Sequence, residues 1–319
     1  MHNSAKGRFV PVFAALLALL GGCGYASQQA EIFHTPVCEL AAFAANYANF
    51  PDASSSQTTA QQWQPLACSL KQLASVKQAQ QIRWAYVDKR AERFAVVGYK
   101  IALGSNAAQR LFGLQQPVVG VLFNDTLINA AQNSESNSNG VSLPRSAGVN
   151  IAYEPDLLVV IKSAAINAAT SIAEVAPHIE SVAAFLEVPD LVVMPEVSAG
   201  PAFIASNAAV RWGVMGDVIK ASSDPVFLDS LQTMQVTAYD QSGIPLSTAP
   251  GSAVMGHPYN AIVFLLDQLR KNGRQLRAGD RISLGAFAPP KPAAQLDSVT
   301  VEYIGLGSQP LSVSASFTD

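Results

Sequence analysis

The spacing of apolar and polar positions changes several times along the chain. Residues 79–94 place apolar side chains at helical intervals, and the β-branched run at 95–103 is typical of a strand. Short apolar segments then predict strands at residues 157–161, 191–194, 234–238, 281–284 and 299–304. Two more helices are expected, over 171–185 and 260–271, and the second ends at an Asn-Gly stop signal.

The order of these elements indicates the fold class. Strands outnumber helices and do not alternate regularly with them, which favours an α+β domain built on a mixed β-sheet or roll over a doubly wound α/β fold. No internal repeat is visible, and the sequence has no GxGxxG or GxxxxGK[ST] loop for a nucleotide. We therefore expect one mixed domain over residues 79–319.

The region before this domain has a different composition. Residues 23–78 are rich in Ala, Gln and Ser and include a polar stretch at 54–59, so we interpret them as a tether and helical lead-in. A second polar stretch, at 133–140, is predicted to be a surface loop.

The first 22 residues have the layout of a bacterial export signal. Lys6 and Arg8 precede an apolar run at 9–20, which is shorter than the roughly 20 residues needed to span a bilayer. The following Leu20-Gly21-Gly22-Cys23 resembles the lipobox of bacterial lipoproteins, which implies removal of residues 1–22 and acylation of Cys23. The alternative is an ordinary cleaved signal in which this cysteine has no such role.

A lipid on Cys23 would tether the chain to a membrane without embedding it. Gly24 after the cysteine resembles outer-membrane sorting, so the expected location is the bacterial cell envelope, with the protein anchored in the outer membrane and facing the periplasm. This compartment permits disulfides, and Cys38 and Cys68 are candidates for a bridge. Two buried free thiols are the alternative.

Composition narrows the function classes. The chain is 49% hydrophobic and 13% charged, which excludes disorder and provides ample material for a core. Its formal net charge of -3 supplies no basic surface for a phosphate backbone, so no nucleic-acid partner is expected.

The acidic residues around one apolar strand are the most informative candidates for chemistry. Glu154 and Asp156 share a face of an extended segment and would repel each other unless a cation or a shared proton compensates. An oxygen-only ligand set suits Mg²⁺ or Mn²⁺, although solvated strand-end acids are the alternative. Glu187 is a third acid in apolar surroundings, unless it ends a helix and faces water.

Other candidates are less specific in sequence. Lys100 lies within a predicted strand and Asp125 follows an apolar run, where either could be an ordinary strand-end charge. His257 lies in a Gly/Pro-rich loop that opens a helix, where backbone N–H groups could meet an anion or the histidine could be structural. No GxSxG elbow is present, and the cysteines belong to the anchor and lead-in, so serine and cysteine nucleophiles are excluded.

Several short motifs occur in one order along residues 80–317: VGYKI at 97–101, GVLFND at 120–125, YEPD at 153–156, LEV at 186–188, SNA at 206–208, GHPYNA at 256–261 and AGDRI at 278–282. In this order they resemble the 2-keto-4-pentenoate hydratase branch of the fumarylacetoacetate hydrolase family. The resemblance implies a mixed-sheet roll of the fumarylacetoacetase C-terminal type. It also implies a lyase, a hydratase or a decarboxylase, acting on a small 2-oxo acid such as 2-oxopent-4-enoate.

The resemblance also implies roles for residues. Glu154, Asp156 and Glu187 would bind a divalent metal, Mg²⁺ or Mn²⁺, that chelates the 2-oxo acid and stabilises its enolate. Lys100 and Asp125 would take part in proton transfer.

The same family pattern places Asn207, Ser252 and His257 along the substrate pocket. Because relatives form dimers or larger rings, the resemblance implies a homo-oligomer.

Three departures from the family pattern affect the expected activity. Asp156 replaces the usual Glu and is one methylene shorter, and residues 102–105 differ from the usual Gly-Leu-Thr-Ser. Ser283 is displaced by one position from the usual hydroxyl, a shift expected to turn it to the other face of its strand. A non-catalytic membrane-anchored lipoprotein that uses the fold for binding is therefore an alternative. A fumarylacetoacetate-type C–C hydrolase is another, and it would need a base to activate water.

Overall fold

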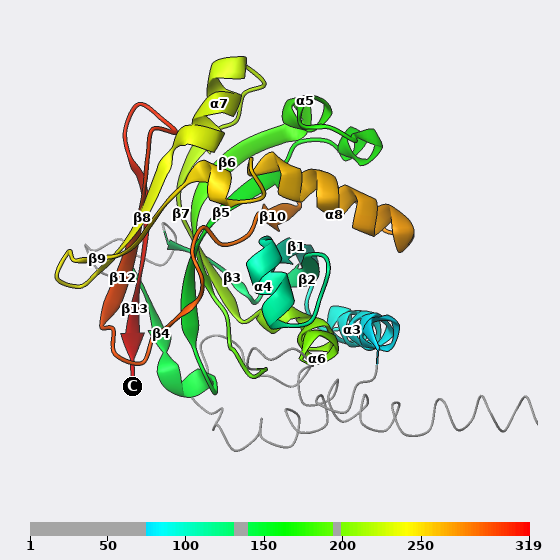
Figure 1. Ribbon diagram of the computed structural model, residues 1–319, viewed down its shortest axis with the longest axis horizontal. Coiled ribbons are helices and arrows are strands. Elements are labelled where there is room, and N and C mark those ends of the chain that lie inside the picture. The colour runs from blue at the N-terminus through cyan, green and yellow to red at the C-terminus, as the bar shows by residue number, and fades with distance from the viewer. Residues whose placement is uncertain (1–74, 131–139, 194–198) are drawn as a thin grey trace, which may run out of the picture.

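The computed structural model describes residues 75–130, 140–193 and 199–319. They form two β-sheets flanked by short helices (Figure 1). The predicted export signal and residues 23–74 of the predicted tether and lead-in, with Cys23, Cys38 and Cys68, lie outside the described residues, whereas the last lead-in residues, 76–78, begin helix α3 (Val76–Ala91). Within the described part of the chain, no helix is long and apolar enough to cross a membrane.

The larger sheet has eight strands in the order β2-β1-β10-β5-β6-β7-β3, with β11 paired to β5. Their bounds are β1 Val96–Ala102, β2 Val118–Phe123, β3 Leu127–Asn129, β5 Ala152–Ile161, β6 Ile179–Val188, β7 Trp212–Lys220, β10 Arg281–Ser283 and β11 Lys291–Pro292. Parallel and antiparallel pairs both occur, so the sheet is mixed.

This sheet curls back on itself. Strands β2 and β3 stand at opposite ends of its order, yet only a short turn joins them along the chain. In that turn the Thr126 N–H donates to the Phe123 carbonyl oxygen at 2.9 Å. Two ends that are joined so closely require the sheet to bend, and the bend gives it an interior and an outer face.

Both faces of the curled sheet are buried. On the interior face, Leu158, Ala183 and Phe185 form a small apolar cluster that is at most 1% exposed. The alternate residues of the same strands, such as Leu157 and Leu186, belong to the main core. This alternation follows the two-residue period of a strand and encloses the interior side chains.

A five-stranded sheet packs against strands β6 and β7 (Figure 1). Its order is β4-β13-β12-β8-β9, with bounds β4 Gly140–Pro144, β8 Gln235–Asp240, β9 Pro245–Pro250, β12 Ser298–Ile304 and β13 Leu311–Thr318. Alternating side chains of β12, including Val299, Val301 and Tyr303, are fully buried. The second sheet therefore covers one side of the strands that carry the acidic residues.

The α-helices are α3 Val76–Ala91, α4 Asn106–Leu111, α5 Ile172–Val175, α6 Gly200–Ala205, α7 Pro225–Thr233 and α8 Tyr259–Lys271. The 3-10 turns are η3 Arg145–Ala147, η4 Ala164–Ala168, η5 Ala176–His178, η6 Asn207–Ala209 and η7 Gly251–Ala253. The Ser75 hydroxyl caps α3 by accepting from the Gln78 N–H at 3.2 Å. Helix α3 packs beside α6, next to the β2 edge of the large sheet (Figure 1).

The α+β class predicted from the sequence is confirmed, as are the helices now seen as α3 and α8 and the strands seen as β1 and β5. The helix predicted over 171–185 is wrong. Its first turn forms α5, but Pro177 cannot continue a helix, and residues 179–188 form β6 between β5 and β7. The β-branched and aromatic side chains of this segment suit a strand paired on both edges.

The strand predicted at 191–194 is also wrong for the described residues 191–193. Asp190 forms one isolated bridge with Ile151, and the Val192 N–H turns back to the Asp190 carbonyl oxygen at 2.9 Å. The chain therefore leaves the sheet directly after β6.

Candidate active site

Three carboxylates gather on the interior face of the curled sheet. Glu154 on β5 is the direct partner of Glu187 on β6 in the antiparallel ladder, and Asp156 lies two residues further along β5 on the same face. Side chains of directly paired residues lie about 5 Å apart at their Cβ atoms. The register therefore brings Glu187 to the two acids that the sequence pattern placed together.

Lys100 reaches this group from β1. Its ammonium group donates to the Glu187 carboxylate, and the two side chains are 3% and 5% exposed. Burial lowers the pKa of Lys100, while the charges of Glu154 and Asp156 act in the opposite direction. The facing position on β2 is Gly120, where a Cβ atom would lie 2.8 Å from the Lys100 Cγ. Glycine thus leaves room for the stem of the lysine.

Asp156 is fully buried and held by protein donors. The Ser283 hydroxyl donates to its Oδ2 at 2.6 Å, and the Gly285 N–H donates to its Oδ1 at 3.0 Å. Burial raises the pKa of Asp156 to about 6, although these hydrogen bonds and Lys100 favour the anion. The loss of hydration therefore outweighs the donors that hold this carboxylate.

Glu154 is the most exposed of the three carboxylates. Burial raises its pKa to about 7; Lys100 lowers this value and Asp156 raises it further. A carboxyl group with such a pKa exchanges its proton near neutral pH.

The donor set fits a hard divalent cation by its chemistry. Three carboxylates face a single lysine, and the raised pKa values of Glu154 and Asp156 indicate that further positive charge would stabilise their anions. Among the described residues, however, no three Asp, Glu, His or Cys side chains are arranged to enclose an ion. In this conformation Lys100 is bonded to Glu187, so a shared ion would require that ion pair to rearrange.

Sequence reasoning gave Ser283 the wrong orientation. It stands in register with Lys100 and with Leu158, so its hydroxyl faces the interior and bonds to Asp156. The one-residue displacement of Ser283 from the family pattern does not decide which face its side chain takes; the pairing of β10 with β1 and β5 does.

Tyr303 was missed altogether. It reaches across from the five-stranded sheet, and its hydroxyl bonds to the Asp156 carbonyl oxygen and, at 2.9 Å, to that of Phe185. The hydroxyl also accepts from the Phe185 N–H at 3.2 Å. No local signal in the sequence marks Tyr303, because its role depends on the packing of two sheets.

Asp125 is not brought to the carboxylate group. It pairs with Arg90 of α3, and the two side chains are 10% and 4% exposed. Lys100 pairs with Gly120, whereas Asp125 lies beyond the far end of β2. Val96 pairs with Phe123 at that end of β2, and it lies four positions before Lys100 on β1. Four steps along a strand correspond to about 13 Å between the two Cα atoms. The proton-transfer role expected for Asp125 has no geometric support here.

The side chain of Asn207 forms hydrogen bonds with backbone groups on the edge of β2 that does not pair with β1. Its Oδ1 accepts from the Val121 N–H at 2.8 Å, and its Nδ2 donates to the Val121 carbonyl oxygen at 2.9 Å. Asn207, Ala208 and Ala209 all have φ values between 55° and 58°, a left-handed backbone that costs non-glycine residues about 1–2 kcal/mol each. This contact supports the strand behind Lys100, whereas the predicted substrate contact stays a prediction.

His257 has both ring nitrogens engaged. Its Nδ1 accepts from the Tyr259 N–H, and its Nε2 contacts the Leu228 carbonyl oxygen, each at 3.0 Å. This pattern fixes the neutral form with the proton on Nε2, and burial lowers its pKa. His257 thus makes the contacts of a structural histidine in this conformation, and its predicted contact with substrate stays a prediction.

Ser252 lies half-buried in η7, where its carbonyl oxygen accepts from the Gly256 N–H at 3.0 Å. Its predicted contact with substrate stays a prediction.

Comparisons with known proteins give a consistent result. No family model matches the chain. The TodF product hydratase of Pseudomonas putida F1 is 32% identical to the chain over 228 residues, which cover 70% of the chain and 76% of the relative. The 2-keto-4-pentenoate hydratase of Burkholderia vietnamiensis G4 is 28% identical over 225 residues, covering 70% and 79%.

The structural comparison agrees on the fold. The 4-oxalocrotonate decarboxylase of Pseudomonas putida G7, complexed with magnesium and adipate, has a TM-score of 0.64 and 24% sequence identity to the chain. The alignment covers 83% of this chain and all of that one. The chain thus shares its fold with this decarboxylase, and its sequence is similar to those of hydratases.

Proposed function

The chain belongs to the family of 2-keto-4-pentenoate hydratases, and we propose that it is a divalent-metal-dependent lyase that acts on a small 2-oxo acid. The observation that carries this proposal is the gathering of Lys100 with Glu154, Asp156 and Glu187 inside the curled sheet. The reaction is hydration of a substrate such as 2-oxopent-4-enoate, or decarboxylation of a related 2-oxo acid.

Glu154, Asp156 and Glu187 would hold the metal, and the magnesium complex of the decarboxylase supports a divalent ion. Mg²⁺ is the first candidate and Mn²⁺ the second, because both prefer oxygen ligands. When bound, the ion would supply Lewis-acid stabilisation of negative charge on the substrate's keto oxygen.

Lys100 is the residue of this chain that would move the proton. Burial lowers its pKa, so the neutral amine is more accessible than on a surface lysine. Once separated from Glu187, the amine can accept a proton from the carbon beside the keto group and return it to another carbon. Tyr303 and Ser283 hold the backbone and carboxylate of Asp156, which keeps this part of the site in place.

The proposal is tested by turnover of 2-oxopent-4-enoate with added Mg²⁺. Turnover is measured as the loss of ultraviolet absorbance of the conjugated dienol tautomer of this substrate. Lys100→Met should reduce kcat by at least about 100-fold, the range expected for loss of a general acid–base. Lys220→Met, which changes an exposed lysine, is the matched control. The lyase proposal fails if the folded wild type, with Mg²⁺ bound, converts neither this substrate nor 4-oxalocrotonate.

A non-catalytic binding module is the second candidate. Two observations favour it, namely that Lys100 is neutralised by Glu187 and that Asp125 is held by Arg90 away from the carboxylates. The C–C hydrolase alternative has less support, because His257 has both nitrogens engaged and cannot serve as its base.

We also propose that the chain is exported and anchored to the outer membrane through Cys23, facing the periplasm, with Cys38 and Cys68 bridged. The sequence layout of residues 1–24 supports this location. Incorporation of labelled palmitate into the wild type but not into Cys23→Ser would support it, and equal labelling or none would contradict it. Non-reducing mass mapping tests the disulfide, and light scattering tests the proposed homo-oligomer.

A further inference from the structure

A cavity of about 430 Å³ lies on the outer side of β2, away from the carboxylate group. Residues of α3, α6, α8 and the loop before β2 line it. Among the described residues that line it, none is acidic and Arg83 alone carries a charge. The cavity size falls in the range of small-molecule sites.

Arg83 is a buried cation without an acidic partner among the described residues. Its side chain is 4% exposed, its Nη1 donates to the Val119 carbonyl oxygen, and its Nε has no hydrogen-bond partner. Burial, together with the charge of Arg274, lowers the pKa of Arg83 to about 10. An anion beside the Arg83 guanidinium would compensate the cost of burying its charge.

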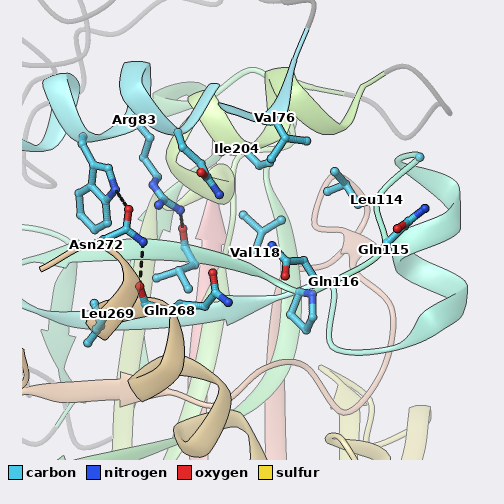
Figure 2. A pocket seen from close by; sticks show the side chains of 15 residues that line it. Val76, Arg83, Leu114, Gln115, Gln116, Val118, Ile204, Gln268, Leu269 and Asn272 are labelled. Carbon is cyan, nitrogen blue, oxygen red and sulfur yellow. Dashed lines mark hydrogen bonds between the residues drawn. The ribbon is translucent and has the colours of Figure 1, made fainter. Parts of the chain in front are cut away.

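The rest of the lining combines apolar and amide side chains. Figure 2 shows Leu114 and Val118 on the side opposite Asn272, with Arg83 reaching in from α3 between them. Amides contribute at several points, including Gln116 on the loop and Gln268 on α8. Apolar walls with a few polar groups and one fixed charge are typical of sites for small organic ligands.

Hydrogen bonds and contacts with the Trp84 ring link the side chains of the wall beside Arg83. The Trp84 Nε1–H donates to Asn272 Oδ1 at 3.1 Å, and Asn272 Nδ2 donates to the Gln268 carbonyl oxygen at 2.7 Å (Figure 2). The guanidinium carbon atoms of Arg83 and Arg274 lie 4.5 Å and 3.8 Å from the centre of the Trp84 ring. These contacts hold the charged group in place before any ligand binds.

We propose that this cavity binds a small organic carboxylate, whose carboxylate group accepts from Arg83 while its hydrocarbon part packs on Leu114, Val118 and Ile204. The strand β2 separates this site from the proposed active site. Gly120 of β2 faces Lys100 in the interior of the curled sheet. Arg83 instead donates to the carbonyl oxygen of Val119, at the outer edge of the same strand.

Isothermal titration of the full-length chain with hexanoate tests the proposal, with hexanamide as the uncharged control. We expect one hexanoate per chain and binding of hexanamide at least about tenfold weaker, because only the carboxylate makes a charge-assisted contact with Arg83. No hexanoate binding by the folded chain, or equal affinity for the two compounds, would overturn the proposal.

Variants locate the binding. Gln116→Glu adds a negative charge at an exposed position of the rim and should weaken hexanoate binding at least about fivefold while leaving hexanamide unchanged. Gln241→Glu, on the distant β8–β9 turn, is the matched control and should change neither. Arg83→Met should abolish hexanoate binding; should it unfold, as judged by circular dichroism, Gln116→Glu decides the question.

Lys100→Met distinguishes the two sites. It should leave hexanoate binding unchanged if the carboxylate binds outside β2. Loss of binding in Lys100→Met together with full binding in Gln116→Glu would place hexanoate inside the curled sheet and refute the cavity site.

Discussion

The ammonium group of Lys100 donates to the carboxylate of Glu187, although 87 positions separate the two residues. Strands β10 and β5 lie between β1, which carries Lys100, and β6, which carries Glu187. In a flat sheet the backbones of β1 and β6 would therefore stand about 14 Å apart. The curl of the sheet turns both side chains into one interior and makes the contact possible. The ion pair therefore reports the bend that brings Lys100 to the three carboxylates, which the register of β5 and β6 already places together.

Ser283→Ala removes the hydroxyl that donates to Asp156 Oδ2 in a fully buried site. We expect a loss of about 1–3 kcal/mol in the free energy of unfolding, because a buried carboxylate loses a donor. Urea denaturation measures this change. Ser312→Ala removes an exposed serine–aspartate contact to Asp217 and should cost less than about 1 kcal/mol. Equal costs for the two variants would contradict the assignment of Ser283.

Tyr303→Phe deletes the hydroxyl that links the two sheets at Asp156 and Phe185. We expect a loss of about 1–2 kcal/mol in stability and a lower kcat with little change in KM, because Tyr303 positions Asp156 and does not meet substrate. Tyr239→Phe, on β8 of the same sheet, is the control. A change in KM with unchanged kcat would instead indicate direct contact with substrate.

Asp125→Asn separates a structural role from a catalytic one. If Asp125 mainly neutralises Arg90, the variant should lose about 3–5 kcal/mol of stability, because a buried charge loses its partner. The turnover rate of the fraction that remains folded should stay within about threefold of the wild-type rate. A turnover rate that falls by about 100-fold or more at unchanged stability would restore the proton-transfer role.

The pH dependence of stability follows from the two raised carboxyl pKa values. Glu154 and Asp156 have pKa values of about 7 and about 6, above their ordinary 4.5 and 3.8. The two carboxyl groups therefore make their full contribution to the free energy of unfolding when the pH is below their ordinary pKa values. This contribution is lost as the pH rises through their raised pKa values. In denaturation of the metal-free chain, Glu154→Gln should gain stability relative to wild type from about pH 4 to pH 7. A difference that is independent of pH would contradict these assignments.

Local sequence patterns predicted much of the fold and part of the site. Helical spacing gave α3 and α8, and the two-residue alternation placed Glu154 and Asp156 on one face. Segment 171–185 was assigned to a helix because its apolar spacing is compatible with one, whereas pairing with β5 and β7 makes residues 179–188 a strand. Tertiary pairing overrides local preference in such short segments.

The rest of the site depends on register and curvature. Ser283 faces Asp156 because β10 pairs with β1 and β5, and Tyr303 arrives from another sheet. The ion pair of Asp125 with Arg90 joins the end of β2 to α3. The sequence motif around Asp125 does not reveal that Arg90 is its partner. Contacts between elements distant in sequence leave no periodic signal in a single chain.

The most direct test of the account is calorimetric titration of the full-length chain with Mg²⁺, with and without oxalate as a mimic of the 2-oxo acid enolate. We predict that oxalate binds only when Mg²⁺ is present. We also predict that Glu187→Gln weakens Mg²⁺ binding at least about 100-fold, since a ligand is lost. Glu302→Gln, on β12 of the second sheet, should bind as the wild type does. Absence of Mg²⁺ binding by the folded wild type, or unchanged binding in Glu187→Gln, would contradict the proposed metal site.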